Sequence, residues 1–598
     1  MTIGLKTGFV FAIALSSGLG LVAAEERAMG FRLPKVRIAV ERQDIASTSK
    51  TRSAVRLGAA PSLPSKWDSR DYGWVSSVKN QGEVGACWTF AACAVLETQL
   101  LKSGRGEWDL SEKNMVNLHG YDLSPDDGGN DYMALAYLTR WGGAVAETND
   151  VYTASMSSWT PSSQLMPIVK VQNVVWVPCR TNYTDNAVLK TAIKTYGAVS
   201  TSLYWNDKYS LNGNYYCGEF FDCNHAVAVI GWDDSYSASN FKTAPAGDGA
   251  FIIKNSWGKS LGKNGYWYVS YYDENFAMME GSVFIPATDD EDYDAVYGYD
   301  TLGAVADTTD TTGYNDENTL EAAVFTSAWN EEIAAVGVYS CIEGNPYEVS
   351  VWTNVTRTTA TKRPNPLAGG ALAAKKSGTI THAGFTTIPL NAAVKIADGT
   401  SFAVVYSQTG RKHPHVFCCS ASDARGTYAS VEAHSGNTYW GKPVYRGTNW
   451  TDLAVHATYP NSIACIKAYT RSTVAERDLP AESDDGTAAL EWLAETNATL
   501  YAETSATFGA FAGLVGANRR TLWASYVAGF DPANPDDGDL EVMISVTNGV
   551  PYLTWTPDLG ASARAYTIWG RRRLDGDSSW ETPTNSLHRF FKVVVDMK

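Results

Sequence analysis

The chain has 598 residues, of which 44% are hydrophobic and 12% aromatic, and 51 are glycines. This length exceeds what one hydrophobic core supports and predicts roughly three or four domains. The formal net charge is −16, and the longest basic run is Arg571–Arg573. This balance argues against a nucleic-acid partner, because binding a phosphate backbone requires clustered lysines and arginines.

The N-terminus has the pattern of a secretory signal. Lys6 precedes an apolar stretch over residues 8–22, and small residues up to Ala24 come before a polar break at Glu25. We therefore expect residues 1–24 to be removed and the protein to be secreted, at the cell surface or in the periplasm. A retained membrane anchor is the alternative. The apolar stretch is shorter than the about 20 residues that a spanning helix needs, which favours the signal.

The next region, residues 25–62, is interpreted as an N-terminal arm or a short propeptide. Residues 63–287 are expected to form an α+β unit of two packed lobes. Apolar residues at helical spacing predict helices over residues 88–102 and 132–141. Runs of β-branched and aromatic residues predict strands over residues 226–231, 250–254 and 265–272. A cleft between two such lobes is a natural position for an active site.

Two acidic stretches divide the remaining chain. Residues 289–294 are interpreted as a linker, followed by a β-sandwich over residues 295–471, where apolar or alternating runs lie between turn residues. Residues 476–485 precede a smaller, mostly β C-terminal domain, residues 486–598. This last domain is predicted to contain a helix and four strands, over residues 488–514, 540–547, 551–556, 565–569 and 589–596.

The chain contains nine cysteines. Setting Cys87 aside leaves eight, which an exported protein could pair as disulfides, and Cys217 and Cys223 are close enough in sequence to close a small loop. No pair of cysteines is separated by two residues, and histidines are scarce near them. A tetrahedral zinc site is therefore not expected, and neither a metal nor another cofactor is predicted.

Cys87 carries the clearest chemical signal. It follows a glycine-rich turn that begins at Gln81, and it starts a predicted helix. The N–H groups at a helix N-terminus favour a thiolate, which is a nucleophile when a histidine stands beside it. A single cysteine is more often a small buried apolar residue, so the prediction depends on its partners.

Two later segments supply those partners. His225 begins an apolar strand, and Asn255 precedes Trp257 by two residues. An asparagine carbonyl can orient an imidazole, and an indole can shield that hydrogen bond from water. A core histidine and an ordinary turn asparagine are the alternatives for each residue alone. The joint order and spacing of the three segments favour catalysis.

These segments resemble the papain-like cysteine proteases, for which a cysteine signature with distant His and Asn partners is characteristic. The resemblance covers residues 63–287. It implies that Cys87 is the nucleophile, His225 the acid and base, Asn255 the orienting residue and Gln81 a donor to the oxyanion. The matching motifs are Cys87-Trp88, Asn224–Val227, Asn255–Gly258, Gly262–Trp267 and the diglycine Gly128-Gly129.

The sequence also departs from the family pattern. Val84 and Asp126 stand where many relatives have two cysteines that form a disulfide, so both halves of that bridge are absent together. A loop over residues 233–248 lengthens the interval between His225 and Asn255. The leader is too short and too weakly helical for the long helical propeptide of many relatives, which argues against zymogen control.

Specificity is predicted only in outline. The resemblance places the substrate along Gly128, Gly129, Asn130 and Asp131, with Asn224 and Trp257 on the opposite wall. Asp131 either favours a basic substrate residue or is a surface carboxylate that caps the next helix. Met278 and Met279 either line the same pocket or fill the core.

Residues 295–471 resemble the lectin-like β-domain that follows the protease in some bacterial papain-like proteins. That resemblance implies a carbohydrate or cell-surface partner, and Tyr439 and Trp440 are either sugar-stacking or packing residues. An oxygen-rich stretch, residues 528–538, is interpreted as a linker rather than a calcium loop, because it lacks the spacing of an EF-hand.

The predicted function is hydrolysis of protein or peptide substrates by a secreted cysteine endopeptidase through a thioester. Two alternatives stay open. One is a catalytically silent binding or adhesion protein on the same scaffold, which the filled catalytic positions argue against. The other is a transpeptidase, which shares the thioester step and passes the acyl group to an amine.

Overall fold

The computed structural model describes residues 29–34, most of residues 63–472, and four strands between residues 541 and 597. The gaps within residues 63–472 are 163–164, 166, 289–292, 308–319, 328–329, 358–363, 409–414, 424–425, 445–446 and 458–459. The expected signal at residues 1–24, the helix at 488–514 and the stretch at 528–538 lie outside the described residues.

The first lobe of residues 63–287, here the two-lobed unit, is organised around helix α1 (Cys87–Lys102). Side chains from Cys87 to Leu100 are all buried, because apolar or small residues occupy every face of the helix. Helices α2 (Glu112–Leu118) and α3 (Asp131–Thr139) pack beside it. The side chains of Ser111 and Asn130 accept backbone N–H groups and cap these two helices.

The second lobe is a sheet in the order β2-β9-β3-β6-β7-β8. Its strands are β2 (Val171–Val177), β9 (Gly281–Pro286), β3 (Val199–Leu203), β6 (His225–Asp233), β7 (Ala250–Lys254) and β8 (Tyr266–Ser270). Helix α4 (Ala187–Tyr196) packs on β6 and β3. The predicted helices and strands of this unit are confirmed, and so is its α+β class.

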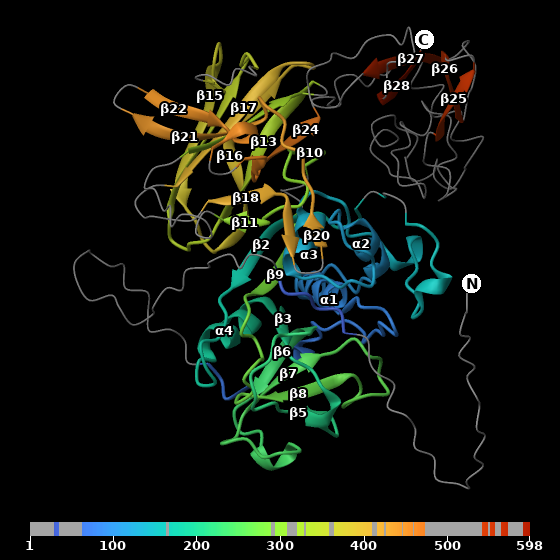
Figure 1. Ribbon diagram of the computed structural model, residues 1–598, viewed down its shortest axis with the longest axis vertical. Coiled ribbons are helices and arrows are strands. Elements are labelled where there is room, and N and C mark those ends of the chain that lie inside the picture. The colour runs from blue at the N-terminus through green and yellow to red at the C-terminus, as the bar shows by residue number, and fades with distance from the viewer. Residues whose placement is uncertain are drawn as a thin grey trace, which may run out of the picture.

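The second unit, here the sandwich unit (residues 293–472), is built mainly on two facing sheets (Figure 1), with a smaller sheet of β11 (Ala306–Asp307), β18 (Val416–Cys419) and β23 (Ser462–Ala464). One of the facing sheets contains β10 (Ala295–Gly298), β24 (Ile466–Ser472), β13 (Glu331–Ser340) and β16 (Gly384–Ile396). The other has the order β15-β14-β17-β12-β21-β22: Ala371–Thr379, Pro346–Thr353, Ser401–Gln408, Leu320–Thr326, Thr438–Val444 and Gly447–Asp452. Val336, Val349 and Phe402 are buried in one apolar core between them. The predicted β-sandwich is confirmed.

The two units share one sheet. Strand β16 of the sandwich unit pairs with β2 of the two-lobed unit, with Gly384 opposite Val175 and Phe385 opposite Val174. Gly384 has φ +125°, and a Cβ there would lie 1.9 Å from the Val174 carbonyl oxygen, so only glycine fits this junction. The shared ladder joins the sandwich unit directly to the sheet of the two-lobed unit, rather than leaving it at the end of a free linker.

A short hairpin of the sandwich unit also reaches the first lobe. It consists of β19 (Ala421–Asp423) and β20 (Gly426–Ala429), and Figure 1 shows β20 beside α3. The backbone N–H of Asp122 donates to the carbonyl of Tyr428 at 3.2 Å. The hairpin therefore brings residues of the second unit next to the diglycine loop of the first.

In the C-terminal region, β25 (Glu541–Thr547) pairs with β26 (Val550–Thr556), and β27 (Arg564–Arg571) pairs with β28 (Phe590–Met597). The four terminal strands occur where the sequence predicted them. Within the described part of the chain, no helix has both the length and the apolar character that crossing a bilayer requires.

The structure decides two points about individual side chains that the sequence left open. Cys217 and Cys223 do not form a bridge, because their thiols donate instead to the carbonyls of Glu219 and Asn275, at 3.3 and 3.5 Å. Tyr439 and Trp440 are only 0% and 4% exposed, so they are packing residues of the sandwich unit and not a platform for a sugar.

Candidate active site

Cys87 lies where the two lobes meet. It is the first residue of α1, and its side chain is fully buried. The backbone N–H of Ala226, the second residue of β6, donates to the Cys87 Sγ at 3.2 Å. The sulfur of the first lobe is therefore held against the beginning of the strand that carries His225.

His225 and Asn255 are joined by a hydrogen bond. The distance between His225 Nε2 and Asn255 Oδ1 is 2.8 Å, and this oxygen also accepts the N–H of Ser256 at 2.8 Å. Strands β6 and β7 are neighbours in the sheet, so the start of one lies beside the end of the other. The Trp257 ring stacks on the imidazole at 4.4 Å with an interplanar angle of 14° and covers this hydrogen bond.

Gln81 is fixed to the same asparagine turn. Its backbone N–H donates to the Ser256 carbonyl at 2.7 Å, and its side-chain Oε1 accepts the Ser256 hydroxyl at 2.5 Å. These bonds orient the amide so that Nε2 lies toward the turn before α1, where it donates to the Val84 carbonyl at 2.9 Å. Gln81 is thus positioned by the second lobe, although it belongs to the first.

The turn over residues 82–86 has two further supports. Tyr152 donates its hydroxyl to the Gln81 carbonyl at 2.8 Å, and the N–H of Glu83 donates to the Ala154 carbonyl at 3.0 Å. The Asp126 carboxylate accepts the N–H of Gly85 at 2.8 Å. Asp126 therefore ties this turn to the diglycine loop with a hydrogen bond, at the place where many relatives have a disulfide.

Residues 29–34, here the arm segment, lie across the diglycine. The N–H of Phe31 donates to the Asn224 carbonyl at 3.1 Å. Gly129 donates to the Gly30 carbonyl and accepts the N–H of Arg32, both at 2.9 Å. A Cβ on Gly30 would lie 2.1 Å from the Gly85 carbonyl, so the chain passes directly over the turn before Cys87. In the sequence, the short leader argues against zymogen control. The position of the arm segment over the turn before Cys87 does not support that expectation.

The arm segment changes the environment of the thiol. Burial raises the pKa of Cys87 to about 12, although the backbone N–H groups of Ala226, Gly30 and Trp88 act in the opposite direction. The sequence predicted a helix terminus that favours the thiolate. For the buried Cys87 desolvation is the larger effect, and it favours the neutral thiol.

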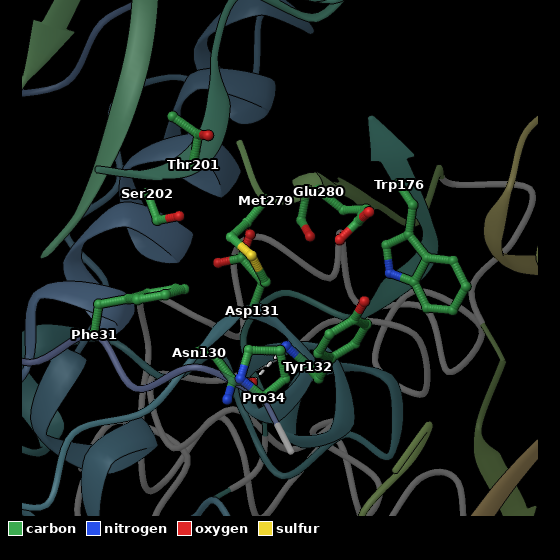
Figure 2. Close-up of a pocket in the computed structure, with 11 residues that line it drawn as sticks. Phe31, Pro34, Asn130, Asp131, Tyr132, Trp176, Thr201, Ser202, Met279 and Glu280 are labelled. Atoms are coloured by element: carbon green, nitrogen blue, oxygen red, sulfur yellow. Dashed lines mark hydrogen bonds between the residues drawn. The ribbon is translucent and has the colours of Figure 1, made fainter. Parts of the chain in front are cut away.

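A pocket opens beside the diglycine. Figure 2 shows Asp131 and Met279 near its centre, with Phe31 of the arm segment at the left and Pro34 below Asp131. Ser200 donates its hydroxyl to Asp131 at 2.7 Å, and burial raises the pKa of Asp131 to about 6. Asp131 is therefore not a surface cap. Asn130 caps α3, which leaves the Asp131 carboxyl in the pocket.

The ten sequence-predicted site residues lie in one region where the two lobes meet, and two of them, Asn130 and Asp131, line the pocket. Gly128 and Gly129 contact the arm segment, and Asn224 presents its backbone carbonyl while its side chain is bonded to Trp205, at 2.7 and 3.0 Å. The sequence did not reveal the roles of the Ser256 and Tyr152 hydroxyls, the position of the arm segment over the diglycine, or the contact of Tyr428. Ser256 lies within the Asn255–Gly258 motif, but its bond to Gln81, like the other contacts, joins segments far apart in the chain.

Two family models match the chain. Residues 63–287 match the family described as "Papain family cysteine protease", and residues 296–470 match the "Lectin like domain". The chain therefore contains a papain-family peptidase domain followed by a lectin-like domain.

Curated relatives match the first of these domains. Cysteine proteinase 1 of Zea mays is 33% identical over 222 residues, which cover 35% of this chain and 56% of the relative. Procathepsin L of Rattus norvegicus is 31% identical over 212 residues, which cover 34% of this chain and 59% of the relative. The chain thus spans somewhat more than half the length of these relatives.

Solved structures extend the likeness to both domains. The cysteine protease and lectin-like domains of Cwp84, a surface layer associated protein of Clostridium difficile, align with a TM-score of 0.58 at 22% identity, covering 75% of this chain and 94% of that one. The clostridial protease Cwp84 after propeptide cleavage gives the same TM-score at 24% identity, covering 69% and 100%. At these identities the likeness establishes the fold.

Proposed function

We propose that this chain, with its papain-family peptidase domain and lectin-like domain, is a cysteine endopeptidase. The observation that carries the proposal is the joint geometry of three residues. His225 is bonded to Asn255 at 2.8 Å, and the next residue, Ala226, donates to the Cys87 sulfur at 3.2 Å. A thiol, an imidazole and an orienting amide are the groups that acyl transfer through a thioester requires.

In the proposed mechanism the Cys87 sulfur attacks the carbonyl carbon of the scissile bond. Because Asn255 accepts from His225 Nε2, the other ring nitrogen, Nδ1, exchanges the proton with the thiol and then with the leaving amine. The oxyanion is stabilised by the backbone N–H of Cys87 and by Gln81, whose amide the Ser256 hydroxyl orients. Water then hydrolyses the thioester with His225 as the base.

We further propose that the arm segment is a short propeptide. It covers Cys87, and an N–H rather than a carbonyl of Gly30 faces the sulfur, so the arm presents no carbonyl carbon to attack. Its removal would expose the groove and reverse the desolvation that keeps the thiol protonated. Export through the predicted signal at residues 1–24 belongs to the same proposal, and N-terminal sequencing of the exported protein tests both processing steps.

The experiment that tests the endopeptidase is the comparison of Cys87→Ala with the wild-type chain on a mixed peptide library. We expect hydrolysis to fall by roughly 10⁴-fold or more, because no other group supplies the nucleophile. Cys93→Ala is the matched control, since Cys93 is buried in the same helix and should leave hydrolysis in place. Undiminished hydrolysis by Cys87→Ala would refute the assignment. Ligated products from the wild type would favour a transpeptidase, and inactivity of the wild type after arm removal would favour a silent binding protein.

A further inference from the structure

One side chain of the sandwich unit lies at the groove. Tyr428, on the β19–β20 hairpin, is 3% exposed and stacks edge-on against Tyr121 with the ring centroids 5.2 Å apart. Its hydroxyl oxygen accepts the Asn130 Nδ2 at 2.8 Å. Because Asn130 follows the diglycine directly, Tyr428 extends the wall of the groove beyond Gly129.

An arginine of the arm segment occupies this position. The backbone N–H of Arg32 donates to Gly129, and its carbonyl accepts the Asn130 Nδ2 at 3.1 Å. Its guanidinium carbon lies 5.6 Å from the centroid of the Tyr428 ring, and the residue is only 7% exposed. The two backbone bonds hold the chain, and the side chain is then buried over an aromatic ring that comes from another unit.

These contacts divide into a general part and a selective part. Gly129 and Asn130 bond peptide groups, which every residue carries, so they select no side chain. The face of the Tyr428 ring attracts a cation through its quadrupole and gives no such attraction to an aliphatic or acidic side chain. Selection at this position therefore depends on the ring.

We propose that Tyr428, together with Asn130 and the carbonyl of Gly129, forms a subsite of the peptide groove that binds an arginine or lysine side chain. The lectin-like domain then contributes directly to substrate choice. The substrate part rests on the proposed endopeptidase function. The binding site itself does not, because Arg32 already fills it in the uncleaved chain.

The first experiment measures the contact in the full chain without using catalysis. The rate at which iodoacetamide alkylates Cys87 is followed by mass spectrometry for the wild type, Arg32→Ala, Tyr428→Leu and the double variant. We expect each single change to loosen the arm and raise the rate by about 2-fold to 30-fold, the range of a cation–π contact. The double variant should be no faster than the faster single variant, since both remove the same contact.

Conservative variants separate the ring and the charge from general packing. Tyr428→Phe keeps the aromatic ring and Arg32→Lys keeps the positive charge. Both variants should therefore be alkylated within about 2-fold of the wild-type rate, which is the smallest change expected for loss of a cation–π contact. Tyr439→Leu, which changes another buried tyrosine of the sandwich unit, should not alter the rate. Additive effects of Arg32→Ala and Tyr428→Leu would overturn the proposed subsite.

The second experiment uses the enzyme after removal of the arm and peptide pairs that differ by Arg or Ala at one position. At the peptide position that the Tyr428 subsite binds, the wild type should cleave the Arg peptide with a higher kcat/KM than the Ala peptide. In Tyr428→Leu the ratio of these two kcat/KM values should fall by about 2-fold to 30-fold. Partial misfolding of a variant lowers the apparent kcat/KM for both peptides of a pair and leaves the ratio of the two values unchanged. An unchanged ratio in Tyr428→Leu would overturn the substrate part of the proposal. Absence of all cleavage by the wild type would instead overturn the endopeptidase function, and the alkylation result would still report on the site.

Discussion

Polar side chains stabilise both the two-lobed unit and the sandwich unit, but the side chains next to Cys87 bond different partners from those of the sandwich scaffold. In the two-lobed unit, the buried Gln81 and the exposed Asp126 bond backbone groups of the turn before Cys87, and Asp273 bonds backbone groups elsewhere in that unit, which also contains the buried Lys113–Asp150 ion pair at 2.7 Å. In the sandwich unit, Lys467 of β24 forms a buried ion pair with Asp300 at 2.7 Å. The first arrangement holds loops in place for chemistry, and the second joins segments of a scaffold.

This difference predicts whether a substitution should mainly lower activity or mainly lower stability. Loss of a polar group that orients a turn should lower activity more than stability. Loss of one that joins scaffold segments should lower stability more than activity. Four changes test this division, beginning with the largest expected effect.

Lys467→Met should lower the free energy of unfolding by about 3–5 kcal/mol, because it leaves the Asp300 carboxylate buried without its cation. The exposed fractions of the two side chains are 2% and 0%. Chemical denaturation measures this loss, with Lys375→Met as the matched control. The Lys375–Glu348 pair of the same unit is exposed and should contribute less than about 1 kcal/mol. Equal losses in the two variants would contradict the scaffold role of the buried pair.

Gln81→Ala should lower kcat by about 10²-fold to 10³-fold, because it removes one donor to the developing oxyanion. Gln81→Glu keeps the size and the acceptor for Ser256 but lacks the donor, so it should lower kcat in the same way. Steady-state kinetics on the processed enzyme measure kcat for both variants. The unfolding temperature of both variants should fall much less than that of Lys467→Met. A large fall in stability with kcat preserved would reverse the proposed division.

The titration of Asp273 should make the stability of the two-lobed unit depend on pH. Its carboxylate accepts the N–H groups of Cys217, Asn275 and Phe276 at 2.8–3.0 Å, yet burial raises its pKa to about 7. Since the folded state retains this proton where the unfolded chain has lost it, stability should fall as pH rises from about 4 to about 7. The contribution is on the order of 4 kcal/mol.

Asp273→Asn should remove this part of the pH dependence, whereas Glu274→Gln, at the exposed neighbouring position, should retain it. Denaturation at a series of pH values measures both variants. A contribution from Asp273 that rises with pH over this range would contradict the direction of its pKa.

Asp126→Ala should have the smallest effect, a fall in kcat of about 5-fold to 10-fold, which corresponds to one hydrogen bond of about 1 kcal/mol. The loss should appear in kcat rather than KM, because the turn that Asp126 holds leads to the nucleophile. Asp126→Asn keeps an oxygen that can accept the Gly85 N–H and should restore most of the rate. Equal losses in the Ala and Asn variants would show that the charge, and not the hydrogen bond, is what matters.

The proposed catalytic group could be assembled from the sequence because each member lies in a short motif with its own local signal. Cys87 begins a helix after a glycine-rich turn, His225 begins a strand, and Asn255 ends one. Hydrophobic periodicity predicted those elements, and a helical lobe followed by a strand lobe places their ends at one cleft. The β-sandwich could be predicted for the same reason, since alternation along each strand follows from burial of one face.

What the sequence by itself determined is thus the pair of folds and the identity of the residues at the groove. Only the tertiary structure decided what surrounds them: that the arm segment covers Cys87, that the Asp126 carboxylate accepts the Gly85 N–H, and that Tyr428 reaches Asn130 across 298 positions of sequence. Each of these is a single contact between segments far apart in the chain. Such contacts leave no periodicity in either segment, because they depend on how whole units pack and not on which face of one element is buried.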